Sequence, residues 1–272
     1  MRDGLVGFTG TVGKSILDAV DGIEALYNSS NIEEIRGESF RTLYIAGIAA
    51  DKWLANSSPD EDAAKIDGLI GHLSSARASK AVLISTIDVA YFPDEPYAIN
   101  RRRAEEQVRE IFDDVHVIRL PGLVGKHIKK NFIYDCKHLA PRFFKGELPA
   151  QELSEYYEQD GGIYKLTHHD ERLDEILKER NLTSLRFTSK GSVYQFFQLS
   201  RIKEAMSIAA GNGIEVLDIT SEPVSVEEVC HHEGIDTSLL GDGPSVKYDR
   251  QFGYCMSSKA EVLDAIHEYL EG

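Results

Sequence analysis

The chain of 272 residues contains little cysteine and no long apolar stretch. Its three cysteines, Cys136, Cys230 and Cys255, lie far apart, and no pair has the spacing of a zinc site. A disulfide framework is uncommon in a chain of this size, so we expect reduced thiols. The first residues form no apolar signal segment, and no later run is long enough to cross a bilayer. These absences predict a cytoplasmic protein without a membrane partner.

Positive charge is also scarce. The chain has 30 Lys and Arg against 45 Asp and Glu, which gives a formal net charge of -15. A surface with this excess of negative charge repels nucleic acid and anionic membranes. The composition therefore argues against a nucleic-acid partner, but it allows a small anionic ligand in a local pocket.

A glycine is missing where a P-loop needs one. The stretch "LVGFTGTVGKSIL", from Leu5 to Leu17, contains "GKS" like the end of a P-loop. A P-loop needs Gly-x-x-x-x-Gly-Lys-Ser/Thr, but the place of its first glycine is taken by Phe8. The glycines instead have the spacing of a dinucleotide-binding turn, in which the backbone approaches a diphosphate at a helix N-terminus. The predicted cofactor-binding residues of this turn are Gly7, Phe8, Thr9, Gly10, Thr11, Val12 and Gly13.

An acid is missing after the second expected strand, "EALYNSSN". NAD enzymes of the Rossmann type usually have an acid there for the ribose diol, whereas this strand ends in Asn28, Ser29 and Ser30. Asn28 and Ser29 could accept a 2′-phosphate, with Arg36 nearby, or a plain ribose, or they could form a polar turn with no selective role. The sequence leaves the choice between NAD and NADP open.

Apolar, β-branched runs alternate with helical patterns in the first half of the chain. The expected strands are "LVGFTG", "RTLYIAGIAA", "KAVLISTIDVA" and "VHVIRLPGL", and helices are expected at "PDEDAAKIDGLIGHLSSARAS" and "NRRRAEEQVREIF". Such alternation predicts an α/β fold with a doubly wound parallel sheet of the Rossmann type. The single tryptophan, Trp53, is expected in the core.

The second half has a weaker pattern. We expect helices in "KKNFIYDCKHLAPRFF" up to Pro141, in "LPAQELSEYYEQDGG" and in "DERLDEILKERN", and a capping box at Ser225 and Glu228. The predicted domains are a dinucleotide-binding core of residues 1–125, to which residues 192–222 return, and a small, mostly helical C-terminal substrate lobe. This lobe comprises residues 126–191 and 223–272.

A hydroxyl-bearing strand end and a tyrosine on a helix are the candidate catalytic groups. The strand in "VLISTIDVAYFPDEPYAINRRRAEEQV" ends in Ser85 and Thr86, and Tyr97 and Arg101 follow at helical i, i+4 spacing. A neighbouring cation stabilises tyrosinate, so we expect the pKa of Tyr97 to be lowered toward working pH. The alternative is an ordinary surface pair of Tyr97 and Arg101.

These segments resemble the extended short-chain dehydrogenase/reductase superfamily, of the NAD(P)-dependent sugar-nucleotide epimerase/dehydratase type. The resemblance lies in "GFTGTVG", "ISTIDVAY", "YAINR" and "VIRLPGLVG". It implies that Tyr97 is the general acid/base and that Thr86, or alternatively Ser85, holds the substrate oxygen. Arg101 replaces the lysine of the family's Tyr-x-x-x-Lys; it keeps the charge but cannot relay a proton. Further cofactor contacts are implied for Ala46, Gly47, Leu120, Pro121 and Leu123.

The resemblance implies an NAD(P)-dependent reductase or epimerase that acts on a sugar or sugar nucleotide. Asp88, Asn131 and Gln195 are candidate substrate contacts, and the resemblance also implies a homodimer. The alternative is a catalytically weak or inactive dinucleotide-binding regulatory protein of the same fold; a P-loop phosphotransferase is a third hypothesis. No metal site is expected, because adjacent histidines such as His168 and His169 point about 100° apart on a helix.

Overall fold

The computed structural model describes residues 1–49 and 51–272, which form two compact units. Unit 1 comprises Met1–His127, Phe196–Glu222 and Arg250–Ser258, and unit 2 comprises Ile128–Gln195, Pro223–Asp249 and Lys259–Gly272. The predicted boundaries differ at three places: residues 250–258 and residues 126–127 lie in unit 1, and residues 192–195 lie in unit 2. The first difference arises because residues 254–257 form an edge strand of the main sheet.

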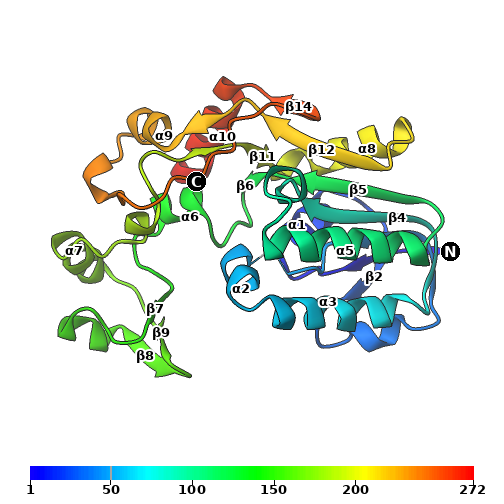
Figure 1. Ribbon diagram of the computed structural model, residues 1–272, viewed down its shortest axis with the longest axis horizontal. Helices are drawn as coiled ribbons and strands as arrows, with labels where there is room; N and C mark the ends of the chain where they lie inside the picture. The colour runs from blue at the N-terminus through cyan, green and yellow to red at the C-terminus, as the bar shows by residue number, and fades with distance from the viewer. Residues whose placement is uncertain (50) are drawn as a thin grey trace. The chain divides into compact units, whose positions relative to one another are not determined.

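Unit 1 is built on one twisted sheet, which can be followed in Figure 1. Among the described residues it has seven strands in the order β14-β12-β5-β4-β3-β1-β2, and each neighbouring pair is parallel. This confirms the predicted fold class. The strands are β1 (Arg2–Val6), β2 (Ile23–Tyr27), β3 (Ser39–Ile45), β4 (Arg77–Thr86), β5 (Val115–Leu120), β12 (Val216–Ser221) and β14 (Tyr254–Ser257).

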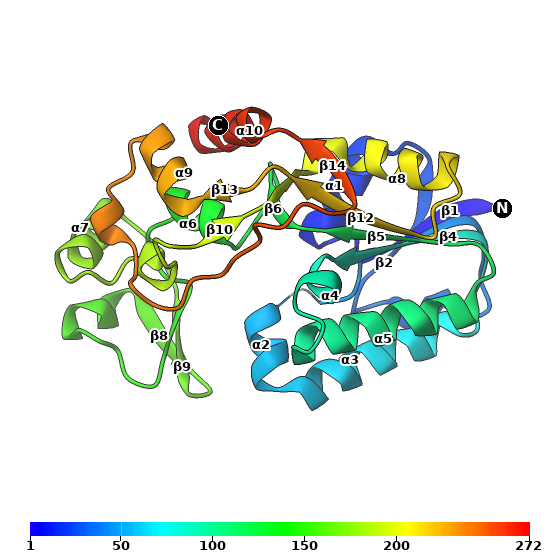
Figure 2. The same ribbon diagram turned by 45° about the horizontal axis from the view of Figure 1, so that its top comes forward.

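Both faces of this sheet are covered because successive strand residues contribute to two separate apolar clusters. Val6 and Leu83 face the cluster that includes Val108 of α5, whereas Leu5 and Val82 face the other cluster. The first face carries α3 (Pro59–Leu73) and α5 (Pro96–Ile111), and the second carries α1 (Thr11–Ala19) and α8 (Ile202–Gly211). Figure 2 shows the sheet between these two layers. Continuous apolar runs, rather than alternating ones, are the sequence pattern of such doubly covered strands.

The strand order reverses between β1 and β3. After β1 the chain builds β2 at the edge of the sheet, passes through the short turn η1 (Ile32–Ile35), and then adds β3 on the opposite side of β1. Ligands of open α/β sheets bind at the carboxyl ends of the strands beside such a reversal. The topology therefore directs attention to the turns that follow β1 and β3.

Short elements complete unit 1. They are α2 (Lys52–Ser57), α4 (Asp88–Tyr91), β6 (Gly122–Val124), β11 (Phe196–Gln198) and η4 (Leu199–Arg201). Trp53 on α2 is 50% exposed, so its predicted place in the core was wrong.

Unit 2 combines short helices with small sheets. Its elements are α6 (Phe132–Lys137), β7 (Phe143–Lys145), η2 (Gln151–Glu155), β8 (Tyr157–Asp160), β9 (Ile163–Leu166), α7 (Glu171–Glu179), η3 (Ser184–Phe187), β10 (Val193–Tyr194), β13 (Val224–Ser225), α9 (Val226–Glu233), η5 (Thr237–Leu239) and α10 (Lys259–Glu271). The capping box of Ser225 and Glu228 is confirmed at the start of α9.

One helix predicted for unit 2 was wrong, and another ends earlier than predicted. The segment "LPAQELSEYYEQDGG" forms η2 and the first strand of an antiparallel hairpin, because Gly161 and Gly162 adopt positive φ angles and turn the chain into β9. The helix expected up to Pro141 ends at Lys137.

Candidate active site

The turn after β1 and the first turn of α1 each have a position that admits only glycine. Gly7 has a φ of +86°, and a Cβ atom there would lie 2.5 Å from the carbonyl oxygen of Ala46. A Cβ atom on Gly13 would lie 2.1 Å from the carbonyl oxygen of Gly7, because the first turn of α1 packs directly on this turn. Gly10 is the N-cap of α1, and no described side chain caps the helix there. The result is an exposed helix N-terminus of the kind that binds anions.

The turn after β3 lies directly against the glycine turn. The N–H of Ala46 donates to the carbonyl of Val6 at 2.9 Å, and a Cβ atom on Gly47 would lie 2.8 Å from a methyl group of Val6. At the next strands along the sheet, Thr86 at the end of β4 is paired with Leu120 at the end of β5. The predicted cofactor residues that follow β1 and β3, and Leu120 at the end of β5, therefore share one edge of one sheet; Pro121 and Leu123 follow β5 in the chain.

The turn after β2 is held by its own polar side chains. The side-chain oxygen of Asn28 accepts hydrogen bonds from the N–H of Ser30 at 2.9 Å and from its hydroxyl at 2.6 Å, while Ser29 is exposed. Arg36, the predicted neighbour for a 2′-phosphate, directs its Nε to His72 Nδ1 at 3.2 Å. These contacts favour a self-contained turn, but they leave the nicotinamide cofactor undecided.

Tyr97 lies in the first turn of α5, and only 5% of its surface is exposed. Its N–H donates to the side-chain oxygen of Asn56 on α2 at 2.9 Å, and the Thr86 side chain is near enough to lower the pKa of its phenol. The Thr86 hydroxyl oxygen also accepts from the N–H of Asp88 at 3.2 Å. The structure thus brings together Tyr97, Thr86 and Asp88, three of the residues predicted from the sequence.

Ser85, the alternative to Thr86, faces another group of side chains. Its hydroxyl donates to Glu105 at 2.6 Å, and Glu105 forms a buried ion pair with Arg119 of β5. Neighbouring residues of a strand point to opposite faces of the sheet, which explains why only one of the two hydroxyls lies beside Tyr97. The geometry therefore favours Thr86 over Ser85.

Arg101 is bound to an acid that the sequence analysis did not connect with it. The guanidinium forms a bidentate ion pair with Asp62 of α3, at 2.8 Å and 2.9 Å, and it donates to the backbone oxygen of Ala49. It also lies over the Tyr97 ring, 4.4 Å from the ring centroid. Because Arg101 is 3% exposed, its interpretation as part of an ordinary surface pair was wrong. Its ion pair holds α3 against α5.

The predicted lowering of the Tyr97 pKa was wrong. Burial raises the pKa of Tyr97 to about 12, and it outweighs the opposite effects of the Arg101 charge and of the hydrogen bond with Thr86. The charge of Asp88 raises it further. Tyr97 is therefore a neutral phenol at neutral pH, which is the form that can donate a proton.

Lys52 on α2 lies near these side chains, and no sequence pattern pointed to it. Its ammonium group lies 3.3 Å from Asp88 and 3.0 Å from Glu95, and 4.2 Å from the centroid of the Phe92 ring. Residues 52 and 88 are far apart in the chain, and no motif relates them. Helix α2 thus contributes Lys52, as well as Asn56, to the surroundings of Tyr97.

The two other predicted substrate contacts, Asn131 and Gln195, belong to unit 2. Asn131 is the N-cap of α6, where its side chain accepts from the N–H of Tyr134 at 3.0 Å. Gln195 is 1% exposed, and its side-chain amide donates to the backbone oxygen of Tyr248 at 3.1 Å. Both residues support the local structure of unit 2, and their contact with a substrate stays a prediction.

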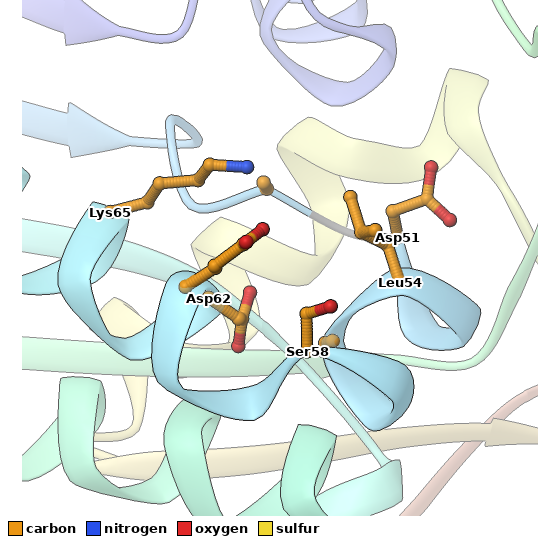
Figure 3. A pocket seen from close by; sticks show the side chains of 8 residues that line it. Asp51, Leu54, Ser58, Asp62 and Lys65 are labelled. Atoms are coloured by element: carbon orange, nitrogen blue, oxygen red, sulfur yellow. The ribbon is translucent and has the colours of Figure 1, made fainter. Parts of the chain in front are cut away.

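A small pocket lies beside the Arg101 ion pair, and no residue of the glycine turn lines it. Figure 3 shows Asp51, Leu54, Ser58, Asp62 and Lys65 around it. The pocket is formed by α2, α3 and the chain just before α2 and includes none of the predicted cofactor residues. We therefore assign the candidate site to the carboxyl edge of the sheet rather than to this pocket.

The described residues were also searched for metal sites, disulfide bonds and membrane-spanning helices. No cluster of three or more His, Cys, Asp or Glu side chains there could hold a metal ion. The cysteines of residues 1–49 and 51–272 are free thiols. Within the same ranges no helix is both long and apolar enough to cross a membrane.

Comparison with known proteins identifies the fold. No protein-family model matches the chain, and no curated protein matches it in sequence. Among solved structures, a dTDP-glucose 4,6-dehydratase from Streptomyces venezuelae with bound NAD has a TM-score of 0.63 at 11% identity, covering 100% of this chain and 98% of that one. An NAD-dependent NDP-hexosamine 5,6-dehydratase of tunicamycin biosynthesis has a TM-score of 0.60 at 13% identity, with 100% and 97% covered.

A third similar structure is a UDP-N-acetylglucosamine 4-epimerase from Methanobrevibacter ruminantium in complex with UDP-N-acetylmuramic acid. It has a TM-score of 0.58 at 12% identity and covers 99% of this chain and 97% of that chain. The chain therefore has the fold of extended short-chain dehydrogenases/reductases over its whole length. At these identities the similarity extends to the fold alone, and the activity is a separate question.

Proposed function

We propose that this protein is an NAD(P)-dependent reductase or epimerase that acts on a sugar or sugar nucleotide. The observation that carries the proposal is the combination, on one edge of one sheet, of a glycine turn that excludes a Cβ atom and a buried Tyr97–Thr86 pair. The solved structures of the same fold described above include NAD-dependent enzymes of sugar-nucleotide chemistry.

The residues of the glycine turn fit a dinucleotide. Gly7 and Gly13 let the backbone and α1 approach closely, and the free N-terminus of α1 would face the diphosphate. Ala46 and Gly47 would pass the adenosine side, and Leu120, Pro121 and Leu123 would line the nicotinamide. Asn28 and Ser29 would lie at the adenosine ribose. The bound cofactor would supply or accept the hydride.

The side chains at the end of β4 would handle the proton. Tyr97, a neutral phenol, would donate its proton to a substrate carbonyl oxygen, and Thr86 would hold that oxygen by a hydrogen bond. Because burial favours the protonated phenol, reduction of a carbonyl is the direction that needs least change at the site. Arg101 would keep the Tyr97 ring in place without touching the substrate.

The first experiment is calorimetric titration of the purified protein with NAD⁺, NADH, NADP⁺ and NADPH. We expect saturable binding of at least one pair, and Tyr97→Phe should bind equally well. Absence of binding by all four dinucleotides would reject the proposal. Turnover is then measured with UDP-glucose, UDP-N-acetylglucosamine and dTDP-glucose by cofactor absorbance and by product analysis.

A regulatory protein that binds the dinucleotide without turnover is the second candidate. The tight engagement of Arg101 with Asp62 favours it, because this cation is not available to bind the cofactor as the family's lysine does. The two candidates differ in Tyr97→Phe: the enzyme loses hydride transfer, by about 100-fold or more if Tyr97 acts as general acid, whereas a binding protein has no hydride transfer to lose.

A further inference from the structure

Because Tyr97 is buried, another group has to return the proton that it gives to a substrate, and Arg101 cannot do this. Tyr97 is 5% exposed, so a proton that it gives to a substrate has to be replaced through other groups of the protein. The guanidinium of Arg101 is always protonated and cannot exchange a proton at neutral pH. A side chain that can both lose and regain a proton must take over this task.

A continuous row of polar groups leads from Tyr97 toward solvent within unit 1. The Thr86 side chain is near enough to Tyr97 to lower the pKa of its phenol, and the Thr86 hydroxyl lies 3.4 Å from Oδ2 of Asp88. The other carboxylate oxygen of Asp88 lies 3.3 Å from Nζ of Lys52. Along this row exposure rises, since the Asp88 side chain is 7% exposed and that of Lys52 is 31% exposed.

We propose that Lys52 is the proton-exchanging end of a relay that runs from Tyr97 through Thr86 and Asp88. The inference rests on the proposed function, and it assigns to α2 the role that a lysine four residues after the tyrosine would have on α5. Lys52 acts through other residues and is therefore a positioning and relay residue rather than a catalytic one.

The relay moves one proton and no electrons. After Tyr97 has protonated the substrate oxygen, its phenolate takes the proton of the Thr86 hydroxyl. The proton that Thr86 gives up is replaced from Asp88, whose carboxylate first takes a proton from the Lys52 ammonium at Oδ1 and presents it to the Thr86 hydroxyl after rotation of the carboxyl group. Water then reprotonates Lys52, so the net change is one proton from solvent to Tyr97.

The surrounding charges suit this path. Asp88, 3.3 Å from Lys52, and Glu95, 3.0 Å from it, hold the ammonium between two carboxylates, so Lys52 stays within reach of Asp88. The Phe92 ring, against which the ammonium lies, keeps the lysine beside both acids. Asn56, on the same face of α2, fixes the first turn of α5 and with it the Tyr97 backbone.

The test measures hydrogen exchange of the Tyr97 hydroxyl in the resting protein. Protein labelled with ¹³C at tyrosine Cζ is transferred into D₂O, and the deuterium isotope shift of that carbon reports the exchange; Tyr97→Phe assigns the signal. Lys52→Met and Lys52→Arg should slow the exchange about tenfold or more, as expected when a positioned proton-transfer group is lost. Lys203→Met, an exposed lysine on α8 of the same unit, should leave the rate unchanged.

A second variant separates proton exchange from charge. Ethylamine should restore the exchange rate in Lys52→Ala, because the free amine replaces the missing side chain. An unchanged or faster rate in Lys52→Met, a wild-type rate in Lys52→Arg, or fast exchange in every variant would each overturn the relay. Titration with the four dinucleotides on the same samples tests the proposed function independently, so a failed relay and a failed cofactor proposal are distinguishable.

Discussion

Removal of the Asp62 carboxylate should destabilise unit 1 strongly. In Asp62→Ala the Arg101 guanidinium, which is 3% exposed, loses its two hydrogen bonds to the carboxylate at 2.8 Å and 2.9 Å. Asn100 also loses its bond to the same group, at 2.9 Å. Breaking a buried ion pair from one side costs about 3–5 kcal/mol, because a charge stays buried without its partner. The melting temperature of a unit of this size should then fall by about 6–20 °C.

The assay is urea unfolding followed by the fluorescence of Trp53. This residue lies on α2, the helix that precedes α3 in the chain. Asp67→Ala is the matched control, because Asp67 on the same helix pairs with Arg103 of α5 but both side chains are nearly half exposed. We expect little change in the control, since exposed pairs are screened by water. A loss below about 1 kcal/mol for Asp62→Ala, in the range of surface pairs, would refute the reasoning.

The double variant Asp62→Leu/Arg101→Met separates the charge from the packing. Replacing a buried pair by apolar side chains of similar volume is often neutral, so the double variant should recover most of the stability lost in Asp62→Ala. Burial opposes ionisation of Asp62, but hydrogen bonds from Arg101 and Asn100 prevail and hold its pKa below the usual value. The stabilisation is therefore present above about pH 4 and is lost as pH falls through the lowered pKa, and Asp62→Asn should remove this pH dependence.

Three further predictions concern other parts of the molecule. Gly13→Ala should abolish dinucleotide binding in calorimetry, since its methyl group would meet the Gly7 carbonyl, whereas the control Gly68→Ala, whose Cβ meets no atom within 4 Å, should bind normally. Burial raises the pKa of Asp135 to about 7, so the folded protein favours the protonated carboxyl group. Its contribution to the free energy of unfolding is present below the unfolded pKa and is lost as pH rises through about 7. Asp135→Asn should then be more stable than the wild type at pH 8 in thermal unfolding, and equal stability there would contradict the assignment. Ser225→Ala should cost about 1 kcal/mol in chemical denaturation, because it removes the cap of α9, and an unchanged midpoint would argue against that cap.

Elements with local causes could be predicted from the amino-acid sequence alone. Buried parallel strands appear as continuous apolar runs, and the glycines at 7 and 13 are required by a positive φ and by contact with the backbone a few residues away. The cap of α9 depends on two residues three positions apart. Such features are fixed by neighbouring residues, so the chain alone contains the information needed to predict them. The hairpin of β8 and β9 was missed although its glycine pair was a local signal.

Contacts between side chains that are distant in the chain could not be predicted, because they depend on how the helices and strands pack. Asp62 lies 39 positions before Arg101, so their contact depends on how α3 packs on α5. Lys52 lies 36 positions before Asp88, so their contact depends on how α2 lies against α4. The same holds for Thr86 and Ser85, which are equivalent in sequence until the direction of each strand residue is known. Burial raises the pKa of Tyr97, whereas the sequence predicted that Arg101 would lower it. Desolvation depends on the whole surrounding structure and not only on the residue four positions away.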